Sequence, residues 1–360
     1  MLVDPWSSTT IENYEHVFKK FGLKRFPKKF CKELKHYLFE RGIVVAHRDF
    51  DKIMHRIKSK KEFINMTGIA SSGMLHFGHK VDIDLFKFFK SKKARNYFAV
   101  CDIDAYVSRP DSVVGSLEKA KEFALENIKD LLALGLDEQD VYVQSNKETR
   151  YYEFAFELSK KITRSTFEAI YGHIDLGKIS ANLLQYADIL HPQLPEFEGK
   201  MPSITGIGLE QDPHARATRD IAARLPYNLE MPSFIYFRHQ SGLLEGTKMS
   251  ASKKETAIFL SEKPETAKRK ILNAFTGGRA TANEQRKKGG KPEMCKVFEF
   301  LLFHYPDTKK IDKIFKDCKS GKWLCGECKN FLIEFVQDFL EEHNARRSRF
   351  EKTAKRIMGY

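Results

Sequence analysis

The sequence predicts an α/β protein, with a parallel sheet followed by an all-helical C-terminal region. Between residues 61 and about 245, apolar runs of strand length alternate with segments whose apolar residues recur at helical spacing. From about residue 262 onward the pattern is helical only. Alternating strands and helices are typical of parallel sheets with right-handed crossovers, which bind ligands at the carboxyl ends of their strands.

The expected elements follow from the spacing of the apolar residues. In chain order they are strand 62–67, helix 78–91, strand 97–103, helix 116–134, strand 141–144, helices 147–171 and 178–190, strand 202–206, a helix from Pro213 and a last helix at 329–347. The helix at 116–134 is expected to end at Gly135, because glycine favours the left-handed conformation of a helix C-cap.

Composition and charge narrow the class of protein. Hydrophobic residues make up 42% and charged residues 31% of the chain, the net charge is +14 and the pI is about 9.3. The sequence has no apolar run of about 18 residues, so we expect no membrane span. The N-terminus lacks the basic and apolar regions of a signal peptide, so a cytoplasmic protein is expected. The positive charge suits a polyanionic partner such as RNA, and equally suits high solubility alone.

A candidate phosphate site lies at residues 65–79, NMTGIASSGMLHFGH. The apolar run breaks at Gly68 and restarts as a helix near Gly78, a layout that sets backbone N–H groups and a helix N-terminus against a phosphate. The rings of His76 and His79 can donate hydrogen bonds to phosphoryl oxygens. Gly78 lacks a Cβ and lets a flat ring approach the backbone. Alone, the pattern also fits an ordinary helix start.

A second stretch, GTKMSAS at 246–252, is a small lysine-bearing loop, which alone also fits an ordinary surface loop. Together and in this order, HFGH and KMSAS resemble the HIGH and KMSKS signatures of class I aminoacyl-tRNA synthetases. Lys248 is the matching charge for the ATP tail. Ala251 stands where the signature has its second lysine, and Lys253 and Lys254 are candidates for the missing cation.

Residues 208–222, GLEQDPHARATRDIA, are similar to the G-x-D-Q and R-D-I-A pattern of tyrosyl and tryptophanyl enzymes, and Q-D-P resembles the archaeal and eukaryotic tryptophanyl branch. By this resemblance Gln211 contacts the amino acid or the phosphate. Glu210 takes the position of a ribose-binding aspartate and is one methylene longer. The same stretch also fits a helix start with Asp212 as N-cap and Pro213 at the first position.

The amino-acid pocket is expected on helix 178–190, where Gln185 and Asp188 share a face. The resemblance assigns such residues to the amino group and the ring of the substrate. Tyrosyl enzymes pair the aspartate with a tyrosine, and this chain has Met66 at that position. Asp188 alone is then left to accept the indole N–H, which favours tryptophan over tyrosine. The alternative role of Met66 is core filling.

The resemblance implies a Rossmann-like catalytic domain that activates L-tryptophan with ATP and Mg²⁺ and transfers it to tRNA(Trp), and it implies a homodimer. It assigns catalytic roles to His76, His79, Lys248 and Ser250, ATP binding to Ser71, Gly78, Glu210 and Met249, and tryptophan binding to Met66, Gln185, Asp188 and Gln211. The alternatives are a tyrosyl-tRNA synthetase of the same fold and a non-catalytic, synthetase-like RNA-binding paralogue.

Three parts of the chain are expected. Residues 1–60 form a basic, aromatic-rich N-terminal appendage that either touches RNA or packs as an amphipathic layer on the next part. Residues 61–261 form the catalytic domain. Residues 262–360 form the helical domain, which by the resemblance binds the tRNA anticodon.

Four of the six cysteines lie in the helical region with the spacing C-x22-C-x6-C-x2-C: Cys295, Cys318, Cys325 and Cys328. Four thiolates suffice for tetrahedral zinc or a 4Fe–4S cluster, and disulfides are not expected in a cytosolic chain. The spacing resembles a subset of tryptophanyl enzymes that carry an iron–sulfur cluster near the anticodon-binding surface, so we rank 4Fe–4S first and zinc second. The alternative is four apolar residues of a helical core.

Overall fold

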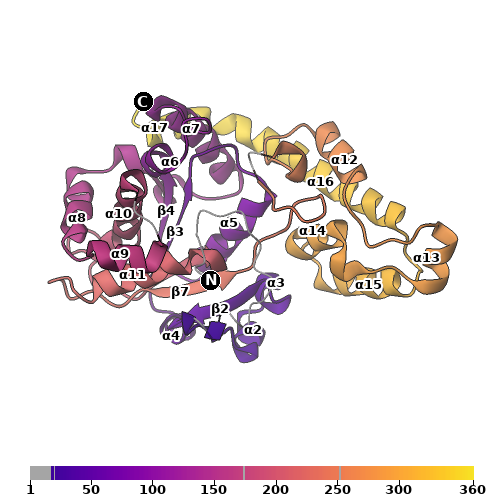
Figure 1. Cartoon of the computed structure of the whole chain (residues 1–360), viewed down its shortest axis with the longest axis horizontal. Coiled ribbons are helices and arrows are strands. Elements are labelled where there is room, and N and C mark those ends of the chain that lie inside the picture. Colours follow the sequence, from indigo (N-terminus) through magenta and orange to yellow (C-terminus); the bar gives the residue numbers. More distant parts are fainter. Residues whose placement is uncertain (1–17, 20, 173–174, 251–252) are drawn as a thin grey trace.

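The computed structural model describes residues 18–19, 21–172, 175–250 and 253–360 (Figure 1). Within them lies a seven-stranded sheet in the order β1-β2-β7-β6-β3-β4-β5. The strands are β1 (Lys24–Arg25), β2 (Val44–Arg48), β3 (Phe63–Ala70), β4 (Ala94–Cys101), β5 (Val141–Val143), β6 (Ser203–Gly208) and β7 (Ser233–Phe237). The strands from β7 to β5 are parallel, and β1 and β2 extend the sheet antiparallel beyond β7.

The strand order changes direction at β3, which is the topological switch point of the sheet. From β3 the chain proceeds to β4 and β5 on one side, and then to β6 and β7 on the other. The crevice at such a switch point, outside the carboxyl ends of the strands, is where open parallel sheets bind ligands. The loops after β3, β4, β6 and β7 therefore define the region in which a site is expected.

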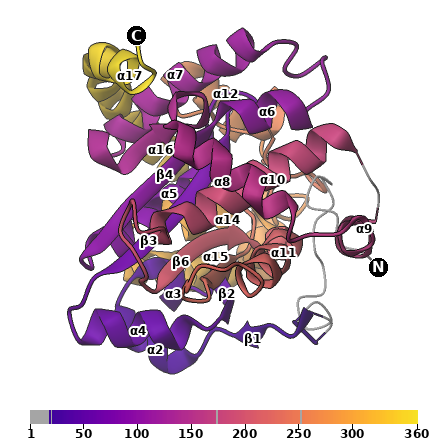
Figure 2. The same ribbon diagram turned by 90° about the vertical axis from the view of Figure 1, so that its left-hand side faces the viewer.

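Helices cover both faces of the sheet. In the first two thirds of the described chain they are α2 (Lys28–Leu34), α3 (Tyr37–Glu40), α4 (Phe50–Lys58), α5 (Phe77–Lys90), α6 (Asp102–Ser108), α7 (Leu117–Ala133), α8 (Thr149–Ser159), α9 (Arg164–Tyr171), α10 (Leu176–Leu190) and α11 (Asp212–Ala222). Phe98 and Val100 of β4 pack in a core with residues of α5 and α7, whereas the thiol of Cys101 points to α10. Figure 2 shows α8 and α10 in front of β3 and β4.

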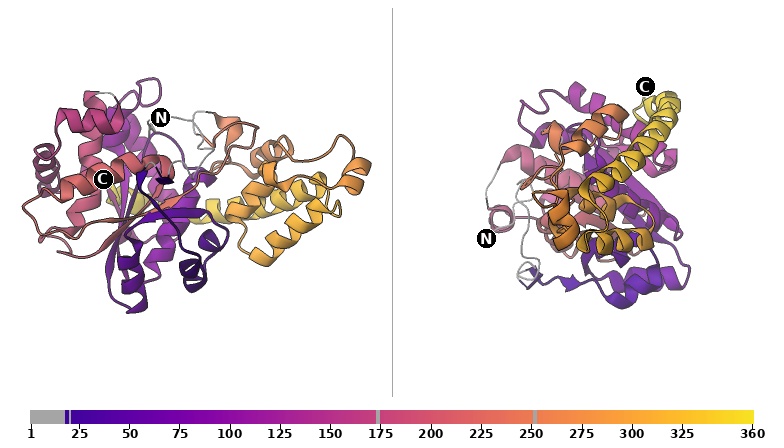
Figure 3. Two further views of the ribbon diagram at one scale, coloured as in Figure 1. Left: turned by 60° about the horizontal axis from the view of Figure 1, so that its bottom comes forward. Right: turned by 90° about the vertical axis from the view of Figure 1, so that its right-hand side faces the viewer.

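The C-terminal part is helical, as predicted. It contains α12 (Pro264–Leu272), α13 (Ala282–Lys288), α14 (Lys296–His304), α15 (Thr308–Lys319), α16 (Cys325–Arg347) and α17 (Glu351–Ile357). Helices α13 to α15 form a lobe that projects from the sheet, and α16 runs from this lobe back to α7 (Figure 3). No helix among the described residues is both long enough and apolar enough to cross a membrane.

The structure confirms the α/β class and differs from the predicted elements in four places. Val44–Arg48, in the expected N-terminal appendage, is a strand of the sheet, because β2 pairs with β7 on one side and with β1 on the other. The expected helix at 147–171 is two helices, and Thr163 caps the second by accepting a hydrogen bond from the Thr166 backbone. The strand expected to reach 103 ends at Cys101, where α6 begins. Asp212 is not an N-cap, since its buried carboxylate pairs instead with Arg48 at 2.9 Å.

Candidate active site

The HFGH turn lies directly after β3, at the start of α5. The rings of His76 and His79 stack with centroids 3.8 Å apart, and the His76 backbone N–H donates to Nδ1 of His79 at 3.2 Å. Burial, followed by the nearby His239 and Arg109, lowers the pKa of His79 to about 4. At neutral pH His79 is therefore uncharged and carries its proton on Nε2, where it can donate a hydrogen bond to a phosphoryl oxygen.

The KMSAS loop contacts the HFGH turn, so two motifs far apart in the sequence form one site. The backbone N–H of Gly78 donates to Sδ of Met249 at 3.1 Å. The segment after the loop runs beside the helix start, where the Phe77 N–H donates to the carbonyl of Ile258 at 3.0 Å. The backbone of Lys248 forms an isolated antiparallel β-bridge with Ser241, which precedes the loop.

Ser250 and Ser71 also fall within the described chain, as do the candidate cations Lys253 and Lys254. Ser250 follows Met249, and Ser71 is fully buried at the end of β3 with its backbone N–H donating to Cys101 at 3.0 Å. Ala251, the position of the missing second lysine, lies outside the described residues.

Glu210 and Gln211 lie in a short 3₁₀ turn directly after β6, at the same edge of the sheet. The Glu210 side chain is 9% exposed and pairs with His239, while Nε2 of Gln211 donates to Oε1 of Glu210 at 3.2 Å. Burial alone would raise the pKa of Glu210, but the neighbouring His239 and Lys248 bring it below its usual value. Glu210 is therefore a charged carboxylate at neutral pH.

The predicted amino-acid pocket forms a polar group around Asp188 of α10. Its buried carboxylate accepts hydrogen bonds from Tyr142 at 2.7 Å, Tyr151 at 2.6 Å and Gln144 at 2.8 Å. Burial raises the pKa of Asp188 to about 6, against the opposing effect of these hydrogen bonds. The hydroxyl of Tyr142 is also 4.0 Å from Sδ of Met66, so Met66 and Asp188 both lie beside the hydroxyl of one tyrosine.

The sequence reading missed three donors around Asp188 and one partner of Glu210. Tyr142 and Gln144 are two residues apart at the end of a strand, a spacing that directs both side chains to one face and could have been noticed. Tyr151 and His239 carry no comparable signal, because they reach the site through pairing of distant segments. Gln185 lies half-buried on α10, three residues before Asp188.

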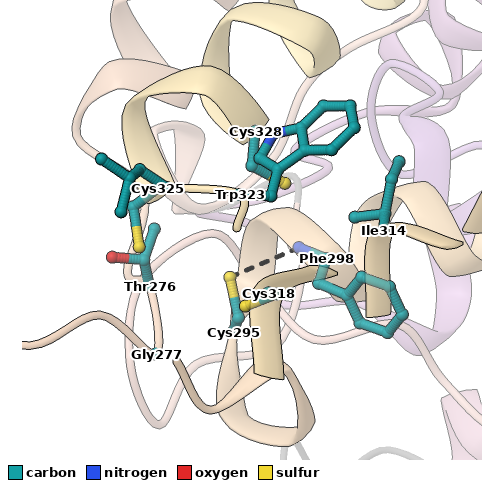
Figure 4. A pocket seen from close by; sticks show the side chains of 10 residues that line it. Thr276, Gly277, Cys295, Phe298, Ile314, Cys318, Trp323, Cys325 and Cys328 are labelled. Atoms are coloured by element: carbon teal, nitrogen blue, oxygen red, sulfur yellow. Dashed lines mark hydrogen bonds between the residues drawn. The ribbon is translucent and has the colours of Figure 1, made fainter. Parts of the chain in front are cut away.

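The four cysteines of the helical lobe line one pocket together with Trp323 (Figure 4). Cys325 and Cys328 come from the first turn of α16, Cys295 precedes α14, and Cys318 is near the end of α15. The backbone N–H of Phe298 donates to Sγ of Cys295 at 3.4 Å. Burial, followed by the neighbouring thiols, raises the pKa of Cys318 to about 11.

Two glycines leave room for these sulfurs. A Cβ on Gly278 would lie 2.9 Å from Sγ of Cys325, and one on Gly290 would lie 2.8 Å from Sγ of Cys318. However, the described chain contains no group of three or more His, Cys, Asp or Glu side chains arranged to hold a metal ion. The pocket gathers the predicted ligands, and the prediction of a bound metal or cluster is not supported by their geometry.

A histidine-bearing turn, a lysine loop and a carboxylate at the switch point of a largely parallel sheet are the arrangement expected of a nucleotide-binding enzyme. The sequence model of the family described as "tRNA synthetases class I (W and Y)" matches residues 58–341, and the chain belongs to this family. It is 38% identical to a tryptophan–tRNA ligase of Aeropyrum pernix, covering 99% of this chain and 97% of the relative. It is 40% identical to one of Methanocaldococcus jannaschii, covering 99% and 98%.

Solved structures show the same likeness. A tryptophanyl-tRNA synthetase from Aeropyrum pernix superposes with a TM-score of 0.89 at 38% identity and covers 98% of each chain. A tryptophanyl-tRNA synthetase from Encephalitozoon cuniculi bound to tryptophan superposes with a TM-score of 0.84 at 25% identity, again covering 98% of each chain. The similarity therefore extends through the C-terminal helices as well as the sheet.

Proposed function

We propose that this chain is an ATP-dependent tryptophan–tRNA ligase, which forms tryptophanyl-adenylate and transfers the tryptophan to tRNA(Trp). The observation that carries the proposal is the full-length likeness to curated tryptophan–tRNA ligases at 38–40% identity. The contact of Met249 with Gly78 supports it, because it joins the two motifs that the reaction requires. The tyrosyl and non-catalytic alternatives are not favoured by these relatives.

The proposed reaction proceeds by positioning and charge stabilisation. The tryptophan carboxylate attacks the α-phosphorus of Mg²⁺-bound ATP in line, and pyrophosphate leaves. His76 and His79 donate hydrogen bonds to the phosphates, and Lys248 and Ser250 stabilise the leaving pyrophosphate. Gly78, Met249 and Ser71 hold the nucleotide.

Two groups of residues are proposed to bind the remaining parts of the substrates. Glu210 binds the ribose, and Gln211 and Gln185 bind the polar groups of tryptophan. Asp188 and Met66 surround the indole. The three hydrogen bonds that Asp188 accepts support this role by fixing the orientation of its carboxylate.

The catalytic assignment is tested by single-turnover adenylate formation. His79→Ala and Lys248→Ala are each expected to lower the rate by about 100-fold or more, equivalent to roughly 3 kcal/mol of transition-state stabilisation, with little change in the Kd for tryptophan. Lys268→Ala on α12 is the matched control, because Lys268 is an exposed lysine paired only weakly with Glu265. Wild-type rates in both active-site variants would remove these two residues from the mechanism.

We further propose that the chain acts as a cytoplasmic homodimer and divides at about residues 60 and 261 into an N-terminal appendage, a catalytic domain and a tRNA-binding helical domain. The likeness to translation enzymes supports the cytoplasmic location, and the net charge of +14 suits a tRNA-binding surface. Sedimentation of the full chain at micromolar concentration is expected to give twice the 41.7 kDa of one chain. A monomer at those concentrations would contradict the dimer.

We also propose that the four-cysteine pocket holds a 4Fe–4S cluster, with zinc as the second choice. The observation behind this proposal is that four thiols line one pocket, although the described residues form no ready-made metal site. Such a group would brace the helical lobe. Anaerobically purified protein is expected to contain iron and sulfide and to absorb near about 400 nm, and Cys325→Ser to lose both, whereas Cys31→Ser keeps them. Protein without iron or zinc, in which all four thiols titrate freely, would exclude the site.

A further inference from the structure

His239 enters the site through the register of two neighbouring strands. In the parallel pair β6–β7, Gly208 is opposite Phe237. Two residues after Gly208 and Phe237 lie Glu210 and His239, and their side chains are within hydrogen-bond distance of each other. The His239 side chain is 38% exposed, in contrast to the buried Glu210. His239 therefore extends from the edge of the sheet onto the carboxylate and is not a core residue.

The two oxygens of Glu210 have different surroundings. Oε1 accepts from His239 and from Gln211. Oε2 is buried and has no hydrogen-bond partner among the residues that the structure describes. A buried carboxylate oxygen without a hydrogen-bond donor costs free energy, so Oε2 is a candidate acceptor for a hydrogen bond from a ligand.

Gly208 makes the arrangement possible. A Cβ at this position would lie 2.5 Å from Nε2 of His239 and 2.6 and 2.7 Å from the two oxygens of Glu210. Both side chains therefore pass directly over the Gly208 backbone. With His239 on one side and the backbone beneath, the longer glutamate side chain is held in one place.

We propose that His239 is a positioning residue that fixes Glu210 so that Oε2 accepts a hydrogen bond from a ribose hydroxyl of ATP. This inference rests on the proposed function, because it needs ATP in the site. Glutamate has one more rotatable bond than the aspartate that the family pattern places here, and His239 removes that freedom before the nucleotide binds. The ribose hydroxyl donates and the carboxylate accepts, so no proton is transferred.

The experiment compares ATP with 2′-deoxyATP and 3′-deoxyATP in tryptophan-dependent pyrophosphate exchange. A site that hydrogen-bonds a hydroxyl rejects an analogue without it, so the wild-type chain is expected to prefer ATP over at least one analogue. His239→Ala is expected to raise the KM for ATP by about tenfold, to leave the KM for that analogue unchanged and to alter kcat by less than about twofold. His239→Gln, which retains a donor, is expected to recover most of the preference.

Two controls separate positioning from other roles. His55→Ala, at an exposed position of α4, should behave as the wild type in every assay. If Glu210→Ala already removes the preference, adding His239→Ala should change it no further, because the two residues act as one unit.

The inference fails if His239→Ala leaves the KM for ATP unchanged. It also fails if the variant weakens ATP and both deoxy analogues by the same factor, which would place His239 on the phosphates. Absence of tryptophan-dependent exchange in the wild-type chain would instead refute the proposed function.

Discussion

Gly78 provides a direct test of the geometry at the start of α5. A Cβ added there would lie 2.9 Å from both Cε1 and Nδ1 of His76 and 3.6 Å from Cβ of Met249. Because carbon atoms pack best at about 3.5–4.0 Å, the His76 ring would have to move by about half an ångström or more in Gly78→Ala. His76 is buried and stacked on His79, so its ring has little room to move.

Two effects on stability oppose each other in this variant. Forcing an extra methyl group into a packed site costs about 1–3 kcal/mol. Replacing a helical glycine by alanine gains about 1 kcal/mol. The free energy of unfolding is therefore expected to fall by about 0–2 kcal/mol, so the variant should remain folded.

The effect on activity should be larger, since a displacement of about 1 Å costs about 100-fold in rate. We expect Gly78→Ala to lower kcat/KM for ATP in pyrophosphate exchange by about 10- to 100-fold. Gly326→Ala is the matched control: Gly326 is the second residue of α16 as Gly78 is of α5, and nothing lies within 4 Å of its added Cβ. Equal kcat/KM values for the two variants would refute the close approach of His76 to Gly78.

Three further predictions concern polar side chains with several hydrogen-bond partners. Asp188→Ala leaves the indole N–H of a bound tryptophan without its acceptor, so calorimetry should show tryptophan binding weakened by about 1–3 kcal/mol. Wild-type affinity would make Asp188, which accepts from Tyr142, Gln144 and Tyr151, a structural residue only. Burial raises the pKa of Asp82 from 3.8 to about 7. Between these two pH values the native chain holds a proton that the unfolded chain has released. The free energy of unfolding therefore falls as the pH rises from 3.8 to about 7. Urea titrations should therefore show that the free energy of unfolding of Asp82→Asn, taken relative to wild type, is about 2 kcal/mol higher at pH 8 than at pH 5. The same difference between variant and wild type at both pH values would contradict the raised pKa. Arg41 donates to three carbonyl oxygens at and just after the end of α14, at 2.9, 2.6 and 3.2 Å. Arg41→Ala should therefore lower the free energy of unfolding by about 1–3 kcal/mol. An unchanged free energy of unfolding would show that these hydrogen bonds do not stabilise the fold.

The parts predicted correctly from the sequence are those fixed by local pattern. The apolar run of β3, the glycine-bearing turn and the helical spacing of α5 lie within 30 residues of each other, so the sequence alone places the HFGH turn. The same is true of α7, whose apolar residues recur at helical spacing. The periodicity of side chains decides these elements before any long-range contact is considered.

The features that were missed depend on distant pairing. Val44 pairs with Phe237 across most of the chain, and no local signal identifies that partner. His239 meets Glu210 only because β6 and β7 are neighbours in a particular register. The position of Asp212 also fits a helix cap, but its carboxylate pairs with the distant Arg48 instead.

The most direct test of the central claim is ATP–pyrophosphate exchange by the full chain with tryptophan, with tyrosine and with no amino acid. The account predicts exchange that depends on tryptophan, and a preference over tyrosine of at least about 100-fold, because a pocket built around an indole N–H acceptor leaves buried groups unpaired when another ring binds. Exchange supported by tyrosine as well as by tryptophan would contradict the assigned specificity. No exchange with either amino acid would contradict the proposed activity itself.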